Sequence, residues 1–376
     1  MTHASLLWVV PEEKGGIRTY SEALWPAVEK AATQASVPFS VFPPLYDLIE
    51  TRSGVQRSVE KIAKLNPTVI HVQHEYGLFG NKIPGFYLFP EWLEGVRRVL
   101  PEVKVFATAH NVLNPDYRFP LKGRGWQIPL RWLANSVFIS RCQRAWSQET
   151  WGRLNGVFVH SRLQKAMVES SGCAKVEVIP HFVPALTPIR TKPNLQRKKI
   201  LVFGFVTPDK GQDIAIEALS LLPDDFELIL AGGPRRPSDE NFVQFCRDKI
   251  KKLGLESRVR LTGFVSAEEV DSFYESASLV LAPFRESSGS GSLVQALGRG
   301  SPVLASDLPL NLEIEERVKG SVKFFSSGSP KSCAEEIKRV LSDPGGIASL
   351  SQAALEYARL NSPKSLADGY LSGYSV

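Results

Sequence analysis

Several features are scarce in this chain of 376 residues, and each scarcity excludes a class of protein. No run of 18 apolar residues occurs, so no transmembrane helix is expected. The four cysteines do not have the spacing of metal or redox motifs, and we expect reduced thiols in a cytosolic protein. The first apolar run covers only Leu6 to Val10 and has no basic segment before it. It predicts a buried strand and not a signal peptide.

The positive charge of the chain is unevenly distributed. Residues 1–183 hold 21 Lys and Arg against 15 Asp and Glu, so they carry the whole net charge of +6. Residues 117–153 combine seven cations with one anion, Glu149, and four tryptophans: Arg118, Lys122, Arg124, Arg131, Arg141, Arg144, Arg153, Trp126, Trp132, Trp146 and Trp151. Cations mixed with tryptophans favour an anionic membrane surface. Nucleic acid and a solvated helical face over a Trp-containing core are the alternatives.

Apolar runs alternate with amphipathic, helix-like segments in two cycles along the chain. This rhythm predicts two doubly wound α/β domains, each with a parallel sheet covered on both faces. The proline-rich and charged stretch 184–199 marks the boundary, so the domains are residues 1–183 and 184–360. Pro363 divides the remaining helical segment, and residues 361–376 form a helix that could cross back to the first domain.

The loops rich in glycine and polar residues follow the expected strands. They are PEEKGGIR (11–18), QHEYGLFGN (73–81), AHNVLNP (109–115), GFVTPDKGQD (204–213), AGGPRRP (231–237) and RESSGSGSL (285–293). Ligands bind outside the carboxyl ends of the strands in such sheets, so these loops mark the candidate site. Residues 287–292 are all Ser or Gly and precede a helix, where backbone N–H groups favour a phosphate. A plain surface loop has the same composition.

Two residue types in these loops suit a phosphorylated ligand. Lys210 precedes a glycine and an expected helix, and its ammonium group can reach a phosphate. Five of the six histidines lie between residues 71 and 181, at or near the ends of apolar runs. A buried or hydrogen-bonded role suits any one of them. His110 stands out because it ends a strand and precedes a loop.

The order of these motifs resembles retaining nucleotide-sugar glycosyltransferases of the GT-B fold, glycosyltransferase family 4. FGFVTPDKGQDIAIEALSLL (203–222) resembles the Lys-Gly donor element, and SGSGSLVQALGRGSPVLASDLPLNLEI (288–314) resembles the helix and Gly-x-Pro-Val turn. GGIRTY (15–20) is similar to the glycine loop of the first domain. HVQHEYGLFGN (71–81) with TAHNVLNP (108–115) is similar to a subgroup regarded as mannosyltransferases.

The resemblance implies an α/β protein of the GT-B fold, with two Rossmann-like domains that face each other across a cleft. The first domain would bind the acceptor, and the second would bind the nucleotide-sugar donor. The implied catalytic residues are His110 and Glu286. The implied donor-binding residues are Gly15, Gly16, Gly204, Lys210, Ser290, Gly291, Ser292, Leu293 and Gln295, and the implied acceptor-binding residues are Arg18, His74, Glu75 and Asn111.

The implied reaction transfers a sugar, with retention, to a glycan or glycolipid in envelope polysaccharide or lipopolysaccharide synthesis. The subgroup favours GDP-mannose as donor. None of the 12 aspartates forms an Asp-x-Asp pair, so we expect neither a metal nor another cofactor. We expect a hexosyltransferase that is cytoplasmic, peripheral at the inner face of the membrane, and without a nucleic-acid partner.

Two departures from the family pattern keep other functions open. Phe205 stands where the family has an arginine, and the family's two glutamates fall on Ser287 and Gln295, with Glu286 one place away. A sugar phosphorylase or a nucleotide-sugar epimerase would use the same fold. A non-catalytic subunit with a degenerate donor site is the third possibility.

Overall fold

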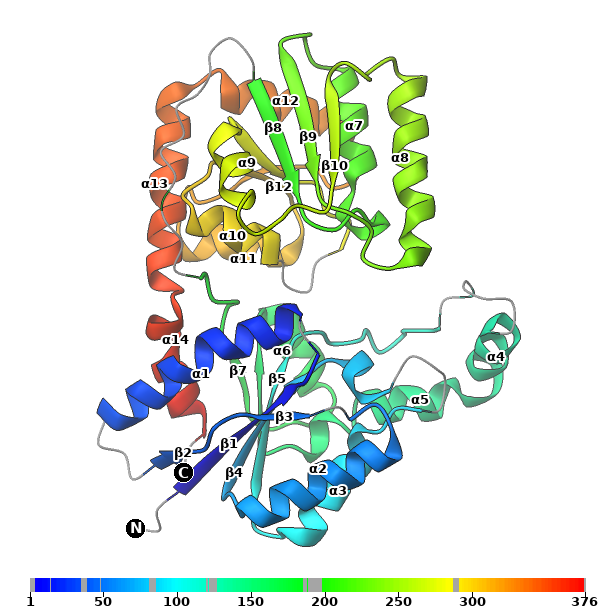
Figure 1. The fold of residues 1–376 in the computed structure, drawn as a ribbon, viewed down its shortest axis with the longest axis vertical. Helices are drawn as coiled ribbons and strands as arrows, with labels where there is room; N and C mark the ends of the chain where they lie inside the picture. The colour runs from blue at the N-terminus through cyan, green and yellow to red at the C-terminus, as the bar shows by residue number, and fades with distance from the viewer. Residues whose placement is uncertain are drawn as a thin grey trace. The chain divides into compact units, whose positions relative to one another are not determined.

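The computed structural model describes residues 4–13, 15–34, 39–47, 49–80, 86–119, 121, 127–184, 188, 198–286 and 291–374. The chain divides into two compact units, Met1–Pro180 with Pro363–Val376, and His181–Ser362. Each unit contains a parallel sheet with helices packed on it (Figure 1). The predicted pair of Rossmann-like α/β domains is therefore confirmed.

The first unit is built on a seven-stranded sheet. Its strands are β1 (Ala4–Pro11), β2 (Phe39–Val41), β3 (Leu45–Asp47), β4 (Val69–His74), β5 (Lys104–Ala109), β6 (Gly156–Val159) and β7 (Val176–Val178). Its helices are α1 (Gly16–Gln34), α2 (Arg52–Leu65), α3 (Phe89–Val99), α4 (Gln127–Leu133), α5 (Ile139–Trp146), α6 (Arg162–Glu169) and α14 (Pro363–Tyr374). Short 3₁₀ turns η1 (Tyr76–Phe79) and η3 (Trp151–Arg153) and the π-helical segment η2 (Ala134–Phe138) complete it.

The second unit is built on a six-stranded sheet. Its strands are β8 (Lys198–Phe203), β9 (Phe226–Ala231), β10 (Val259–Gly263), β11 (Leu279–Ala282), β12 (Val303–Ser306) and β13 (Lys323–Phe325). Its helices are α7 (Gln212–Ser220), α8 (Glu240–Lys252), α9 (Val270–Ser276), α10 (Gly291–Gly298), α11 (Pro309–Arg317), α12 (Pro330–Leu341) and α13 (Pro344–Leu360), with 3₁₀ turns η4 (Pro208–Lys210) and η5 (Pro237–Asp239).

Proline and capping residues set several helix starts. Thr51 caps α2 by accepting a hydrogen bond from the amide of Gly54 at 3.1 Å. Asp343 caps α13 in the same way, and Pro344 occupies the first helical position. Helix α13 ends at Leu360 and α14 begins at Pro363, so the predicted break at this proline is confirmed.

Each sheet reverses its strand order once. The first sheet has the order β2-β1-β4-β5-β6-β7, with β3 also paired to β1, so the reversal lies between β1 and β4. The second has the order β10-β9-β8-β11-β12-β13, with the reversal between β8 and β11. The loops at the carboxyl ends diverge at such a reversal, and this is where α/β sheets bind ligands.

Both faces of the second sheet are buried, because alternate strand residues point to opposite sides. Leu201 packs in a core formed with α9, α10 and α11, whereas Ile200 and Val202 pack in a core formed with α7, α8 and α12. These helices lie on the two sides of the sheet in Figure 1. The continuous apolar runs of the sequence therefore match a sheet covered on both faces.

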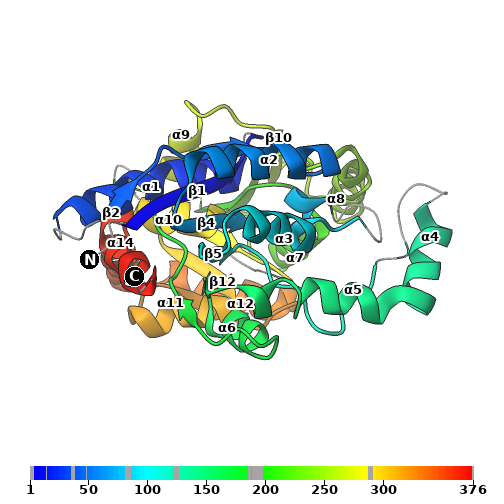
Figure 2. The same cartoon turned by 90° about the horizontal axis from the view of Figure 1, so that it is seen from below.

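Helix α14 completes the core of the first unit. It lies beside α1 in both views (Figures 1 and 2), and the hydroxyl oxygens of Tyr20 and Tyr370 lie 2.8 Å apart. The Tyr374 hydroxyl lies 2.7 Å from Nδ1 of His71, whose ring stacks on Trp8 with centroids 4.5 Å apart. This aromatic layer covers one face of the first sheet, and α2 and α3 pack on the other.

Candidate functional site

The reversal between β8 and β11 brings Gly204 against the start of α10. Gly204 follows β8 with a φ of 124°, a conformation that side chains rarely adopt. A Cβ atom at this position would lie 3.6 Å from Cβ and Oγ of Ser292. Gly291 and Ser292 begin α10, and the N-terminus of a helix carries a partial positive charge. The backbone amides at the start of α10 therefore lie next to the end of β8, where Gly204 has no side chain.

Lys210 lies beside this place, in the loop after β8. Its ammonium nitrogen is 4.1 Å from the centroid of the Phe284 ring, which follows β11. Burial lowers the pKa of Lys210, Asp209 opposes the shift, and the charge of Arg235 adds to it. A Cβ atom at Gly211, whose φ is 67°, would overlap the carbonyl oxygen of Pro283. The two loops therefore hold the lysine between them.

An ion pair fixes the backbone of the lysine loop. The Arg285 guanidinium donates to both carboxylate oxygens of Asp213, at 2.8 and 2.7 Å. It also donates to the carbonyl oxygen of Pro208 at 2.9 Å, and the Arg285 amide donates to the carbonyl of Asp209 at 2.9 Å. The paired carboxylate of Asp213 raises the pKa of Arg285. Bidentate geometry of this kind is both strong and directional, so Lys210 rests on an ordered loop.

Arg235 is a second cation near Lys210, and it was not among the site residues expected from the sequence. Its guanidinium lies 5.4 Å from the centroid of Phe205, and Nη2 is 3.4 Å from Oδ2 of Asp209. The amide of Val206 donates to the carbonyl of Gly233 at 2.9 Å, which ties the loop after β8 to the loop after β9. The sequence contained one signal, the loop AGGPRRP after a strand.

The other donor-side candidates differ in position. Leu293 is buried in α10, at 3% exposure, so only its backbone can serve a ligand. Glu286 is exposed at the end of the loop after β11. Ser290 and the remainder of residues 287–290 lie outside the described residues. The expected acidic contact of Glu286 with the transferred sugar stays a prediction.

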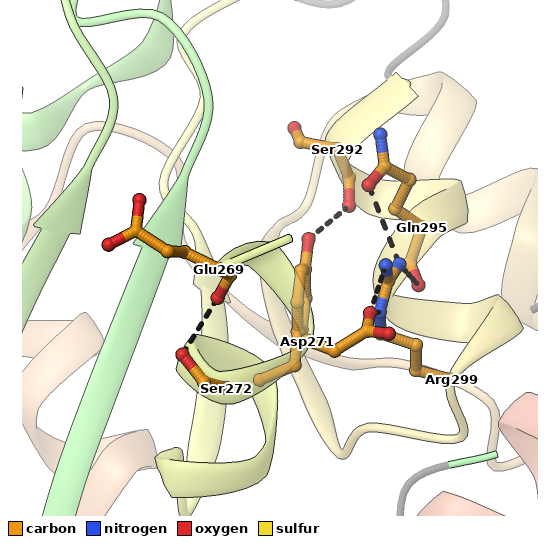
Figure 3. Close-up of polar contacts among 7 residues, drawn as sticks. Glu269, Asp271, Ser272, Ser292, Gln295 and Arg299 are labelled. Carbon is orange, nitrogen blue, oxygen red and sulfur yellow. Dashed lines mark hydrogen bonds and ion pairs between the residues drawn. The ribbon is translucent and has the colours of Figure 1, made fainter. Parts of the chain in front are cut away.

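Gln295 belongs to a polar cluster on α9 and α10 (Figure 3). The Arg299 guanidinium donates to Asp271 Oδ1 from Nε at 2.9 Å and from Nη2 at 2.6 Å. From Nη1 it donates to the main-chain oxygen and to Oε1 of Gln295, at 3.2 and 3.4 Å. Its carbon Cζ lies 4.6 Å from the centroid of Tyr274, whose hydroxyl donates to the carbonyl of Ser292 at 3.5 Å.

The first unit places other candidates at its own strand reversal. Gly15 precedes α1 and Gly16 is its first residue. Both are exposed, and a Cβ atom added at either would have nothing within 4 Å. Arg18 lies in the first turn of α1. It donates to Glu22 at 2.8 Å and to the carbonyl of Glu12 at 2.6 Å. Arg18 therefore ties α1 to the loop that precedes it.

His110 follows β5 in a hydrogen-bonded group of polar side chains. Its Nε2 lies 2.8 Å from Oε1 of Gln73, and its Nδ1 lies 3.5 Å from Nε2 of His160. His160 in turn places Nδ1 3.0 Å from the carbonyl oxygen of Ile179. The ring of Tyr20 packs edge-on against His110, with centroids 4.9 Å apart. His110 is thereby oriented by its neighbours, and Asn111 beside it is half-buried.

The side chain of His74, which the resemblance implied in acceptor binding, is fully buried. Nε2 lies 2.8 Å from the Tyr87 hydroxyl, and burial lowers the pKa of His74 to about 3. All six residues of β4 are buried, so a strand-end position did not bring this side chain to the surface. Glu75, next along the chain, accepts from the amide of Gly77 at 2.9 Å and so caps η1.

Comparison with known proteins assigns the second unit to a family. Residues 187–360 match the family model of the glycosyl transferases group 1. The group 1 domain therefore contains Gly204, Lys210, Arg235 and the α10 cluster. Its parallel sheet, with the parallel sheet of the first unit, has the architecture of the GT-B glycosyltransferases.

Curated relatives of the chain are themselves named glycosyltransferases. The 2-deoxystreptamine N-acetyl-D-glucosaminyltransferase of Niallia circulans is 25% identical over 193 residues, which cover 50% of this chain and 43% of the relative. The D-inositol 3-phosphate glycosyltransferase of Salinispora tropica is 28% identical over 174 residues, covering 44% and 35%. The chain thus spans less than half the length of these relatives. Their names and the group 1 domain support a transferase.

Solved structures share the fold over both units. HepE from Anabaena, crystallised with UDP, has a TM-score of 0.72 at 16% identity and is covered over 99% of each chain. Sucrose-phosphate synthase from Thermosynechococcus elongatus has a TM-score of 0.71 at 16% identity, covering 99% of this chain and 98% of that one. Other HepE structures contain UDP-glucose, or UDP with glucose.

Outside the group 1 domain, residues 127–146 present an exposed apolar surface. Five large side chains of α4, η2 and the residues at their ends are 42–61% exposed: Leu130, Trp132, Leu133, Val137 and Phe138. Arg141 and Arg144 of α5 are exposed beside them. Trp146 and Trp151 are instead buried, at 3% and 1%, so these two are core residues and not part of a surface. We call this surface of α4–α5 the apolar–basic surface.

Two features are absent from the described part of the chain. No helix there is long and apolar enough to span a membrane. No group of three or more His, Cys, Asp or Glu side chains in the same residues could hold a metal ion.

Proposed function

We propose that the protein is a glycosyltransferase that moves a sugar from a nucleoside-diphosphate donor to a glycan or glycolipid acceptor. The observation that carries this proposal is the loop arrangement at the β8–β11 reversal of the group 1 domain. Lys210 and Arg235 lie in the loops there, and the missing side chain of Gly204 lets a ligand approach the first turn of α10. Two cations and the positively polarised N-terminus of a helix suit a diphosphate.

The donor diphosphate would be neutralised by the protein alone. Lys210 and Arg235 supply the charge, and the amides of Gly291 to Leu293 supply hydrogen-bond donors. Gly204 leaves room for the diphosphate, and Gln295 contacts the ribose. We propose that no metal takes part, since two protein cations can neutralise the diphosphate charge.

The reaction we propose proceeds with retention at the anomeric carbon. The bond from the sugar to the diphosphate breaks, and a new bond forms to an acceptor hydroxyl on the same face. The leaving phosphate oxygen accepts the proton of that hydroxyl, while Lys210 and Arg235 stabilise the charge of the leaving group. We propose catalytic roles for Glu286 in the second unit and for His110 in the first unit, which binds the acceptor.

The donor is proposed to be GDP-mannose, and UDP-sugars are the competitors because the HepE structures contain UDP or UDP-glucose. The acceptor is a glycolipid or glycan of the cell envelope, held while the apolar–basic surface contacts an anionic membrane. Exposed apolar side chains beside arginines are suited to that contact.

The test is a panel of UDP- and GDP-sugars incubated with the purified protein. Thermal shift reports binding, and release of UDP or GDP reports turnover with water or an added sugar acceptor. We expect one nucleotide to stabilise the protein and its sugar conjugate to be consumed. Binding without turnover on any acceptor would favour a non-catalytic subunit, and phosphate-dependent turnover would favour a phosphorylase. Absence of binding to every nucleotide would overturn the proposal.

A further inference from the structure

The guanidinium of Arg299 determines which way the amide of Gln295 points. Arg299 is 5% exposed, and four of its hydrogen bonds go to Asp271 and Gln295 (Figure 3). Arginine has N–H donors and no acceptor, so the amide atom that faces it must be the oxygen. The amide nitrogen of Gln295 consequently faces away from Arg299.

This orientation turns a donor toward the start of α10. In Figure 3, the nitrogen of Gln295 lies on the side opposite Arg299, toward the end of the helix at which Ser292 lies. Ser292 is three residues before Gln295, so the two share one side of the helix. Ser292 also borders Gly204 at the strand reversal. The N–H groups of Gln295 therefore point toward the proposed ligand.

Arg299 is itself held from two sides. Asp271 accepts two hydrogen bonds from it, and the Tyr274 ring packs 4.6 Å from its Cζ. Both residues belong to α9, whereas Gln295 belongs to α10. Because these contacts already order the Arg299 side chain, it loses little conformational entropy when it orients Gln295. Residues that support a binding site act in this way.

We propose that Arg299 is a positioning residue that locks Gln295 as a hydrogen-bond donor to a ribose hydroxyl oxygen of the nucleotide. This inference rests on the proposed function. It assigns a direction to the contact: the ligand oxygen accepts, and position 295 donates without bearing a charge. A glutamate at this position would do the opposite, because a carboxylate only accepts.

The experiment measures how much one ribose hydroxyl contributes to binding in each variant. Titration calorimetry would use UDP or GDP, whichever binds the unmodified protein, with its 2′-deoxy and 3′-deoxy forms. Removal of the contacted hydroxyl should weaken binding to the unmodified protein about threefold to tenfold, the weight of one neutral hydrogen bond. In Gln295→Leu the same removal should cost less than about twofold, because the contact is already lost.

Arg299→Met is the decisive variant, since it keeps the apolar stem and removes the donors. It should lower the preference for the ribonucleotide over its deoxy form as much as Gln295→Leu does. Its affinity for the deoxynucleotide should stay within about twofold of that of the unmodified protein. Asp271→Asn is the second variant. Asp271 is 60% exposed, so this change should perturb little beyond the hydrogen bonds to Arg299. The preference for the ribonucleotide over its deoxy form should fall, but less than in Arg299→Met.

Several outcomes separate the inference from its alternatives. If Arg299 only joins α9 to α10, both variants should weaken ribose and deoxyribose nucleotides equally, and the preference should be unchanged. That result would overturn the inference, and so would an unchanged preference in Asp271→Asn if Arg299→Met did not fold. Failure of the unmodified protein to bind UDP and GDP would instead contradict the proposed function.

Discussion

The ammonium nitrogen of Lys210 lies 4.1 Å from the centroid of the Phe284 ring, on a loop from the other side of the strand reversal. An aromatic face attracts a cation without neutralising it. Lys210 is therefore held in place while its charge stays available for a ligand. Asp209, beside it in the chain, is 3.4 Å from Arg235. The Asp209 carboxylate therefore lies near two cations, Lys210 and Arg235, and the three groups together carry one net positive charge.

Lys210→Met should remove this charge and keep the contact of the side-chain stem with Phe284. We expect binding of UDP or GDP to weaken by about 1.5–3 kcal/mol, the weight of a charge-assisted hydrogen bond. Calorimetry measures it. Lys252→Met, on the exposed end of α8, is the matched control and should bind normally. Equal affinities in the two variants would remove Lys210 from the site.

Arg235 and Arg236 form a natural pair for comparison, because they are adjacent and both exposed. Arg235→Met should weaken nucleoside-diphosphate binding about fivefold to twentyfold and flatten its salt dependence, since a cation beside the phosphates is lost. Arg236→Met should leave both unchanged. Titrations at two salt concentrations measure the difference, and parallel behaviour of the two variants would contradict the role of Arg235.

The sequence predicted the two sheets and the loop that holds Lys210. Apolar runs indicate buried strands, and glycine and proline indicate the turns between strands and helices. It indicated the loop that contains Arg235 but not that residue, and it did not indicate Arg299. An arginine on a loop or at a helix end has no periodic signature, and the partner of Arg299 lies 28 residues away. The sequence did not show that His74 is buried, because a histidine at a strand end does not reveal which face its ring takes. The side-chain direction depends on packing by Tyr87 and its neighbours.

Replacing Val137 and Phe138 by Ser should weaken binding to vesicles that contain anionic lipid. These two side chains are 61% and 50% exposed, so little stability is lost with them. Co-sedimentation with and without phosphatidylglycerol measures the effect, and salt should weaken binding because exposed charges are screened beyond about 10 Å at 0.1 M. Phe245→Ser, on α8 and 46% exposed, is the control. Recovery that is independent of lipid charge argues for a different partner.

Acidification should destabilise the first unit through His71 and His74. Burial lowers the pKa of each to about 3 from an ordinary value of 6.5. Above pH 6.5 these histidines are neutral in both the folded and the unfolded chain, so the free energy of unfolding has its full value. As the pH falls from 6.5 toward 3, the histidines bind protons in the unfolded chain but stay neutral in the folded chain, and the free energy of unfolding decreases. Each histidine should then cost about 1.4 kcal/mol per pH unit. Urea unfolding at pH 7 and pH 5.5 measures this, and ring-proton NMR shifts that titrate near pH 6.5 in the folded protein would refute it.

Chelation should leave turnover intact. If Lys210 and Arg235 neutralise the diphosphate, incubation with EDTA should change the rate by less than about twofold, and added Mg²⁺ or Mn²⁺ should not raise it. Nucleotide release in the sugar panel measures the rate. A loss on chelation that a divalent ion restores would mean that a metal, and not the arginine, completes the charge.

The aromatic layer of the first unit depends on α14, which follows the whole second unit in the chain. Residues 4–178 contain every strand of that sheet, yet Tyr370 and Tyr374 arrive only after the whole second unit has been synthesised. Until then the faces of Trp8, His71 and Phe158 lack their cover. The second unit, by contrast, is continuous in sequence and can close its own core as it emerges. During translation the first unit therefore starts before the second unit but is completed after it.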